Sequence, residues 1–361
     1  MEDPIRWMRH ARTLAAGARL HAPPNPWVGC VIVKGNSIIG EGCTQPPGQP
    51  HAEIKALRQA TGHTQGATLY VTLEPCPHTG KTPPCTEAII RSGIREVYVG
   101  IEDPDPHVQG KGLTTLRNAG IQVIQGICWQ EIEEDLAPYL HQRRSHLPYT
   151  ILKAAISLDG RIAAVDGTSQ WITGTEARQD VHLQRARSQA IVIGSGTALR
   201  DFPRLTVRYP HDEENRQPLR VLLDARGRVP ARGALFDRSL APTLVFTTDQ
   251  CSEERQSEWR TSGAEVILVP LSSSGLDLPT TWRTLGERGL LQVLVEGGAT
   301  LHTALLHTSL VNRLLIYMGP LLLGASGYPL YTDSIATLEE AKRFSLREVT
   351  RLGECVRLDY S

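Results

Sequence analysis

The residues HAE at 51–53 and EPCPHTGKTPPC at 74–85 decide the fold of the first part of the chain. HAE follows the loop PPGQP at 46–50 and opens a helical pattern. The second stretch begins where the β-forming run at 67–73 ends, and its last cysteine opens the next helical pattern. His51, Cys76 and Cys85 therefore occupy neighbouring element ends, where three side chains can meet.

The three residues are suited to a zinc ion. Imidazole nitrogen and thiolate sulfur are preferred zinc donors, and three protein ligands leave one position for water, which distinguishes a catalytic site from a structural one. Zinc lowers the pKa of bound water from ~16 to ~7. Glu53 is placed to take the proton of this water and pass it to a leaving group. We predict His51, Cys76 and Cys85 as metal ligands and Glu53 as the catalytic residue.

The spacing points to one class of zinc enzyme. H-x-E followed by P-C and a second cysteine is the signature of the zinc nucleobase deaminases, in which the cysteines are usually arranged as C-x-x-C. Here the longer loop at 77–84 separates Cys76 from Cys85. Its Lys81 is expected to bind a substrate phosphate. A structural zinc site with His78 as the fourth ligand is the alternative, although such a site has no need for Glu53.

The pattern outside these motifs predicts two domains. Before residue 146, β-forming runs alternate with helical runs at 51–60, 85–92 and 111–119, as in an α/β sandwich built on one sheet. A charged helix at 131–144 and the loop SHLP at 145–148 end this series. A second α/β series follows, so we place the domains at 1–146 and 147–361. Its predicted strands lie near 150–157, 190–193, 220–223, 244–247, 265–269, 292–295 and 313–317, and its predicted helices near 176–187, 253–259, 281–287 and 299–307.

Composition favours a small-molecule substrate. The chain has 38 Lys plus Arg and 38 Asp plus Glu, and its longest basic run is the pair Arg143-Arg144. Nucleic-acid binding requires clustered cations to displace counterions, so we expect no nucleic-acid partner. Asp3 and Pro4 open an amphipathic helix and not a secretion signal, and no apolar run reaches the ~20 residues of a membrane span. With seven cysteines, an odd number, we expect a cytoplasmic protein without a membrane partner.

The motifs together closely resemble the bifunctional deaminase/reductases of riboflavin biosynthesis. In the first half the resemblance is carried by PNPWVG at 24–29, HAE and the loop ending TPPC. In the second it is carried by LKAAISLDGR at 152–161, SQWIT at 169–173 and VEGGATL at 295–301. It implies a cytidine-deaminase-like α/β/α sandwich followed by a dihydrofolate-reductase-like α/β domain. It also implies zinc in the first domain, NADPH in the second, and a homo-oligomer.

The implied chemistry is two successive reactions. The first domain removes the 2-amino group of a diaminopyrimidinone that carries a phosphoribosylamino substituent, and the second reduces the ribosyl group to ribityl with NADPH. Carried over by motif, the implied cofactor contacts are Ala155, Trp171, Thr197, Asp201, Ala225, Gly298, Ala299, Thr300, Leu301, His302, Thr303 and Ala304. The implied substrate contacts are Asn25, Lys81, Lys153, Ser169, Arg185, Leu205, Arg208 and Glu296, with Lys153 close to the reacting centre.

Part of the second site follows from the residues themselves. The β-forming run at 292–295 leads through Gly297-Gly298 into a helical run, so free backbone N–H groups face a place where a pyrophosphate fits. A strand–Gly–Gly–helix turn is also common as plain structure, and neither this turn nor GSGT at 194–197 matches G-x-G-x-x-G. Arg185 and Arg208 suit a bidentate phosphate clamp, whereas exposed arginines are usually solvated.

Three positions depart from the family's pattern. Thr44 replaces a usual histidine, Asp105 replaces the asparagine of Asp-Pro-Asn-Pro, and Phe202 replaces a second aspartate after Asp201. Two alternative functions fit the residues less well. A deaminase of bases in RNA or DNA needs a basic, aromatic channel, and a zinc-stabilised binding module has no use for Glu53.

Overall fold

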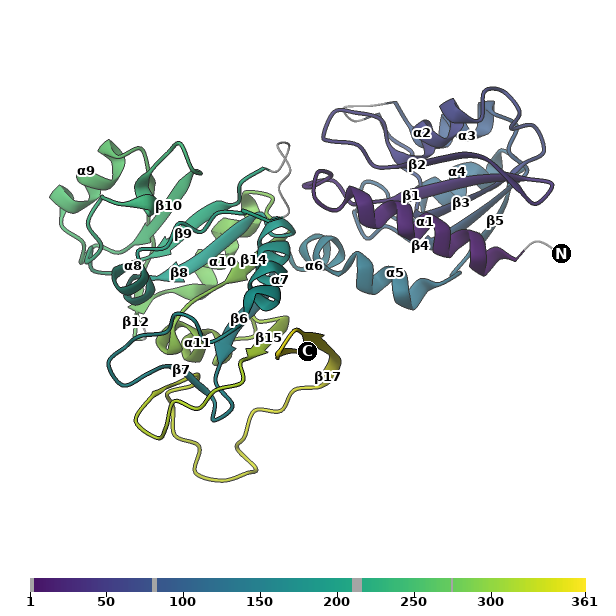
Figure 1. Cartoon of the computed structure of the whole chain (residues 1–361). Coiled ribbons are helices and arrows are strands. Elements are labelled where there is room, and N and C mark those ends of the chain that lie inside the picture. The colour runs from purple at the N-terminus through teal and green to yellow at the C-terminus, as the bar shows by residue number, and fades with distance from the viewer. Residues whose placement is uncertain (1–2, 80–82, 210–215, 274) are drawn as a thin grey trace. The chain divides into compact units, whose positions relative to one another are not determined.

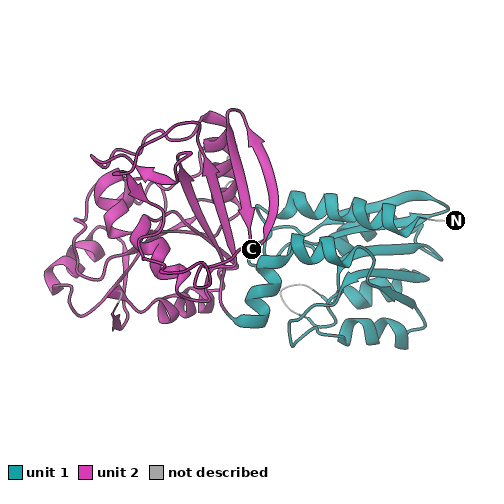
Figure 2. Ribbon diagram, turned by 90° about the horizontal axis from the view of Figure 1, so that it is seen from below, with its two compact units in different colours: residues 1–146 teal, residues 147–361 magenta. Residues whose placement is uncertain are grey.

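The computed structural model describes residues 3–79, 83–209, 216–273 and 275–361. The chain divides into two compact units, Met1–His146 and Leu147–Ser361 (Figure 2). Within the described residues, no helix is both long and apolar enough to cross a membrane.

Unit 1 is built on a five-stranded sheet of order β2-β1-β3-β4-β5 among its described residues (Figure 1). β1 is antiparallel to β2 and β3, whereas β3, β4 and β5 are parallel. The strands are β1 (Gly29–Lys34), β2 (Ser37–Cys43), β3 (Thr68–Leu73), β4 (Glu96–Ile101) and β5 (Gln122–Gln125). The helices are α1 (Pro4–Ala18), α2 (Ala52–Gln59), α3 (Cys85–Arg91), α4 (Lys111–Asn118), α5 (Trp129–Asp135) and α6 (Ala137–Ser145).

Glycines show that α1 and α2 cover opposite faces of this sheet. A Cβ at Gly29 would lie 1.8 Å from the carbonyl oxygen of Ala11 in α1, and one at Gly42 would lie 2.4 Å from that of Ala52 in α2. Gly42 is paired with Cys30, the residue after Gly29, and successive residues of a strand point to opposite faces. The sheet is therefore covered on both sides, and α2 holds the HAE motif against the Cys30 face.

Unit 2 contains a nine-stranded sheet of order β11-β10-β9-β8-β14-β6-β15-β18-β17 in its described part. Its strands are β6 (Tyr149–Ile156), β8 (Ala190–Gly194), β9 (Leu219–Leu223), β10 (Thr243–Thr247), β11 (Glu265–Leu268), β14 (Gln292–Val295), β15 (Arg313–Met318), β17 (Leu346–Leu352) and β18 (Cys355–Tyr360). Two small sheets pair β12 (Leu271–Ser272) with β13 (Gly275–Leu276), and β16 (Tyr328–Pro329) with β7 (Arg161–Ala163). The helices are α7 (Thr175–Ala186), α8 (Ser195–Asp201), α9 (Glu253–Thr261), α10 (Leu278–Glu287) and α11 (Ala299–Leu306), with a 3₁₀ turn η1 (Ala234–Phe236).

Apolar side chains pack on both faces of the large sheet. Leu152 and Val295 share one cluster with Trp282 of α10 and Leu305 of α11. On the other face, Ile191 packs near Trp259 of α9, and Ile151 packs near Val181 of α7. Because β6, β8, β9, β10, β14 and β15 are parallel, their carboxyl ends share one edge. In open α/β sheets that edge is where ligands bind.

The structure confirms two α/β folds and differs from the sequence prediction at particular elements. The helix predicted at 131–144 is two helices, α5 and α6, because Leu136 leaves helical geometry just before Pro138, at the start of α6. Strands β2, β17 and β18 and helix α8 were not predicted. β17 is exposed except at Thr350 and Leu352, so it lacks the alternating pattern that identifies a buried strand.

Candidate functional site

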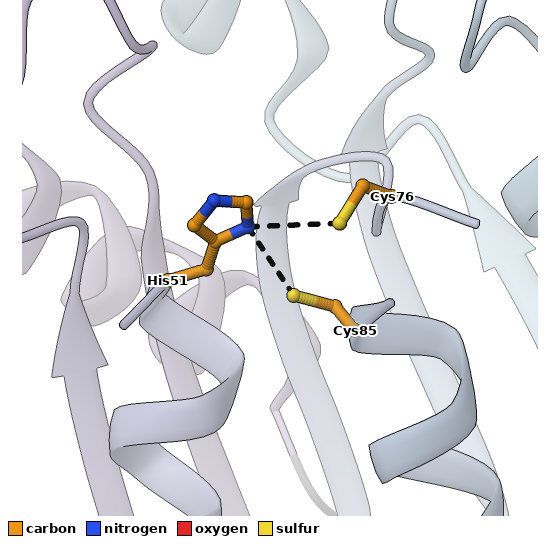
Figure 3. A group of neighbouring side chains, drawn as sticks. All are labelled: His51, Cys76 and Cys85. Carbon is orange, nitrogen blue, oxygen red and sulfur yellow. Dashed lines mark hydrogen bonds between the residues drawn. The ribbon is translucent and has the colours of Figure 1, made fainter. Parts of the chain in front are cut away.

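Three elements bring the predicted metal ligands together. His51 is the N-cap residue of α2, Cys85 is the first residue of α3, and Cys76 lies in the segment after β3. The Nδ1 of His51 is 3.6 Å from the Sγ of Cys76 and 3.3 Å from the Sγ of Cys85 (Figure 3). Each side chain offers one donor atom, and all three donor atoms lie within 4.8 Å of one another.

These distances fit a tetrahedral zinc site. Bonds of ~2.3 Å to sulfur and ~2.0 Å to nitrogen at tetrahedral angles place sulfur and nitrogen about 3.6 Å apart. The hydrogen bonds with His51 and Cys85 lower the pKa of the Cys76 thiol, and Cys76 and burial raise that of Cys85. Of the described histidines only His51 joins the cluster, since His78 is exposed and its ring lies 6.3 Å from that of His107.

Glu53 lies in the first turn of α2, two residues after His51. Only 4% of it is exposed. Burial raises the pKa of Glu53, and the nearby His51 opposes this. A buried carboxyl group close to three metal-ligating groups is suited to take up and release a proton.

The other residues singled out in unit 1 have defined local partners. The Oγ1 of Thr44 accepts the backbone N–H of Val28 at 3.0 Å, so this hydroxyl supports the backbone. Asp105 is 3.3 Å from the Nε of Arg143 and also contacts His107. Asn25 is half-buried, and its backbone N–H donates to the carbonyl of Ala22. Lys81, the predicted phosphate contact, lies outside the described residues.

In unit 2, neighbouring strands bring together Lys153 of β6 and Glu296, which follows β14. Val295 is paired with Leu152 in parallel strands, so the residues that follow them, Glu296 and Lys153, lie side by side. The Nζ of Lys153 is 3.9 Å from the Oε2 of Glu296, and both side chains are largely buried. Although burial alone raises the pKa of Glu296, the charges of Arg185 and Lys153 lower it to about 2. Burial lowers the pKa of Lys153, and Glu296 opposes this.

Arg185 of α7 is paired with Glu296 by two hydrogen bonds. Its Nε donates to Oε1 at 2.6 Å and its Nη2 donates to Oε2 at 2.9 Å, while Nη1 donates to the carbonyl of Thr206 at 3.1 Å. The Nε–Nη2 edge of Arg185 is therefore taken by Glu296. The assignment of Arg185 to the substrate stays a prediction, and the structure shows Arg185 as the ion-pair partner of Glu296.

The remaining predicted substrate residues lie in two segments. Arg208 is exposed, its Nη1 donates to the Thr206 hydroxyl at 3.3 Å, and its backbone N–H donates to the Nδ1 of His182 at 3.2 Å. Leu205 is buried with a φ of +51°, and Ser169 lies between β7 and α7. His182 carries no role in the sequence prediction, yet burial, together with Arg185 and Arg208, lowers its pKa to about 4.

Several of the predicted cofactor residues follow neighbouring strands at the carboxyl edge of the large sheet. Thr197 lies in α8 after β8, and a Cβ at Gly298 would lie 3.6 Å from its hydroxyl. Ala225 follows β9, and Asp201 at the end of α8 interacts with Lys153. Ala155 lies on β6, whereas Trp171 is exposed and packs 4.7 Å from the Arg178 guanidinium.

The predicted turn at 298–304 is the N-terminal part of α11, capped by Gly298. His302 in this turn is fully buried, and neither ring nitrogen has a hydrogen-bond partner among the described residues. One residue that sequence reasoning missed is Arg228, whose Nη2 donates to the Ser195 hydroxyl at 2.6 Å. The free N–H groups at the start of α11 fit a phosphate-bearing cofactor.

Comparisons with known proteins agree with these two sites. Residues 1–101 match the family model for the cytidine and deoxycytidylate deaminase zinc-binding region, and residues 148–358 match that of the RibD C-terminal domain. The riboflavin biosynthesis protein RibD of Chlamydia trachomatis is 47% identical, over 99% of this chain and 95% of its own.

Solved structures agree over the same length. RibD of Acinetobacter baumannii has a TM-score of 0.91 at 40% identity and covers 99% of this chain and 98% of its own. A diaminohydroxyphosphoribosylaminopyrimidine deaminase/5-amino-6-(5-phosphoribosylamino)uracil reductase of Thermotoga maritima has a TM-score of 0.87 at 33% identity, with coverage of 99% and 98%.

The two folds and their sites define a bifunctional enzyme with a zinc-dependent deaminase half and a reductase half. The deaminase-like and reductase-like folds expected from the sequence are thereby confirmed, as are zinc and NADPH as the cofactors of the two halves. The chain belongs to the RibD family of riboflavin biosynthesis proteins.

Proposed function

We propose that the first half hydrolyses 2,5-diamino-6-(5-phosphoribosylamino)pyrimidin-4-one to 5-amino-6-(5-phosphoribosylamino)uracil, and that the second half reduces the ribosyl group of this product to ribityl. The Thermotoga relative, a deaminase/reductase named for these two substrates, supports the proposal. The observation that carries the proposal is the cluster of His51, Cys76 and Cys85 with the buried Glu53 beside it.

In the deaminase half, His51, Cys76 and Cys85 would hold the zinc. When bound, the zinc activates a water for attack on the amino-bearing carbon. Glu53 takes a proton from this water and delivers it to the leaving amino group, so that the carbon gains oxygen and ammonia departs. Burial raises the pKa of Glu53, which favours uptake of this proton.

In the reductase half, the carboxyl edge of the large sheet would hold the cofactor and the product of the first reaction. NADPH supplies the hydride when it is bound. Thr197, Gly298 and the first turn of α11 offer backbone N–H groups to its phosphates. Lys153, a buried cation 3.9 Å from Glu296, is the group that we assign to deliver the proton that the opening sugar ring requires. The exposed Arg208 remains a candidate for the substrate phosphate.

The physiological setting is part of the proposal. The substrate is a small molecule, and the balance of 38 cationic and 38 acidic residues supports the absence of a nucleic-acid partner. We also propose a cytoplasmic enzyme, as the odd number of cysteines indicates, and a homo-oligomer. Gel filtration with light scattering tests the second point, and a monomeric mass would contradict it.

One assay tests both reactions. The diaminopyrimidinone phosphoribosyl compound is supplied with NADPH, and ammonia release and NADPH absorbance are followed together. Wild type is expected to release ammonia and then to oxidise NADPH. The Glu53→Gln variant is expected to retain zinc, lose ammonia release, and still oxidise NADPH when given the deaminated product. Glu41→Gln is the matched control, because Glu41 is half-exposed on β2 and pairs with His10. Unchanged ammonia release in Glu53→Gln would contradict the mechanism.

A further inference from the structure

Glu74 is a buried carboxylate between β3 and the metal ligand Cys76. It is 4% exposed, and it accepts four backbone N–H groups from one segment. Its Oε2 accepts those of Asp103 at 3.2 Å and Gly110 at 3.0 Å. Its Oε1 accepts those of Gly112 at 2.9 Å and Leu113 at 3.2 Å. Both oxygens therefore accept two hydrogen bonds from backbone donors.

The segment that Glu74 holds borders the metal site. It runs from the end of β4 into α4 and carries Asp105 and His107. The ring of His107 lies 6.3 Å from that of His78, two residues after Cys76. Packing between the two segments is close, since a Cβ at Gly112 would meet the carbonyl oxygen of Pro75 at 2.1 Å.

We propose that Glu74 is a positioning residue of the deaminase half: it fixes the segment 102–113 beside the metal site, so that this segment can hold the pyrimidine. The proposal rests on the function proposed above for His51, Cys76 and Cys85. Four hydrogen bonds from one segment to the two oxygens of a single buried side chain define one loop geometry. Glu74 lies two residues before the metal ligand Cys76, and its side chain bonds the segment 102–113. It therefore links the metal ligand to the segment that we propose to hold the pyrimidine.

Glu74→Gln tests this link with almost no change in shape. In either amide orientation the –NH₂ group faces two N–H donors, so two of the four hydrogen bonds are lost. Misplacement of binding groups by ~1 Å can lower rates by ~100-fold. We expect kcat/KM for deamination to fall by ~10-fold to ~100-fold, mainly through a higher KM. Amide hydrogen exchange is expected to accelerate at residues 103, 110, 112 and 113.

Three measurements separate positioning from general damage. Zinc content and the visible absorption spectrum of the Co²⁺-substituted enzyme are expected to match wild type. NADPH oxidation on supplied deaminated product is also expected to match wild type. The matched control is Thr64→Val, because the buried hydroxyl of Thr64 donates to the Ser92 carbonyl at 2.6 Å, in contacts separate from segment 102–113. This control is expected to keep the wild-type KM.

Two outcomes would overturn the proposal. One is an unchanged KM and kcat in Glu74→Gln, and the other is loss of zinc in proportion to activity, which would make Glu74 a support of the metal loop only. If Glu74→Gln does not fold, Glu74→Asp provides the second variant, because its shorter side chain cannot reach both pairs of N–H groups. It is also expected to raise KM, and a wild-type KM would again overturn the proposal. Failure of the proposed function is distinguishable, because wild type itself would then release no ammonia.

Discussion

Replacing Arg185 by Gln is expected to destabilise unit 2 by about 3–4 kcal/mol at pH 7. The change leaves the buried carboxylate of Glu296 without the two hydrogen bonds that it receives from Arg185. Breaking a buried ion pair by removing one partner costs ~3–5 kcal/mol. Despite burial, the pKa of Glu296 is lowered from 4.5 to about 2 by Arg185 and also by Lys153, which gives this destabilisation the same sign.

The sign of the pH dependence follows from the lowered pKa. An acid whose pKa is lower in the folded state stabilises that state fully above its ordinary pKa, and this contribution is lost as the pH falls towards the folded value. The difference between wild type and Arg185→Gln should therefore be largest above pH ~4.5 and shrink between pH ~4.5 and ~2. For a domain of this size, 3–4 kcal/mol corresponds to a decrease of about 10 °C in Tm.

The assay is thermal or urea unfolding of the full chain. Hydrogen exchange, measured by mass spectrometry on peptides from each unit, reports the unfolding of each unit separately. Unit 1 peptides provide the internal reference. The double variant Arg185→Gln/Glu296→Gln is the comparison, and it is expected to be less destabilising because it removes both members of the buried ion pair. A loss below 1 kcal/mol in Arg185→Gln, or a loss that does not vary with pH, would refute this account. The comparison also matters for activity, because loss of NADPH oxidation in Arg185→Gln alone does not separate substrate binding from folding.

Three further predictions concern the two sites. Removing the metal with a chelator should stop ammonia release and leave NADPH oxidation on supplied deaminated product intact. Added Zn²⁺ should restore ammonia release. Continued ammonia release without metal would contradict the metal site at His51. Burial raises the pKa of Asp103 to about 6, above its ordinary 3.8. Because the folded state then binds a proton more tightly than the unfolded state, unit 1 should lose stability as the pH rises from ~4 to ~6. Asp103→Asn should remove this dependence in unfolding midpoints measured across that range. Lys153→Met should lose at least 100-fold in NADPH oxidation with unchanged deamination, measured in the same reaction, and a near-normal reductase rate would count against Lys153 as the proton donor.

Local sequence rules suffice for the parts of the fold that depend on local chemistry. The proline-rich loop before His51 and the Pro84-Cys85 step mark helix starts, and the structure begins α2 and α3 at these positions. The metal ligands can be predicted from the sequence because few residue types bind zinc. Most other side-chain roles can be filled by many residue types. The predicted trio therefore lies together, although its members come from three elements.

Long-range pairing explains most of what the sequence did not reveal. Glu296 and Arg185 are each recognisable as charged residues near predicted element ends, but their pairing depends on β14 and α7 meeting in space. Glu74 reads in sequence as a residue before Pro-Cys, and its four N–H donors lie well beyond it in the chain. The exposed strand β17 carries no periodic apolar signal. Such features follow from topology and not from local propensity.

The break between α5 and α6 determines where the two activities can be separated by truncation. From α6, the hydroxyl of Tyr139 donates to both carboxylate oxygens of Asp103, and the guanidinium of Arg143 faces Asp105. A deaminase shortened to end with α5 would lose both partners and leave Asp103 as a buried carboxylate without its phenol donor. A free-standing deaminase therefore has to keep α6 through Ser145, even though that helix contributes no ligand to the metal.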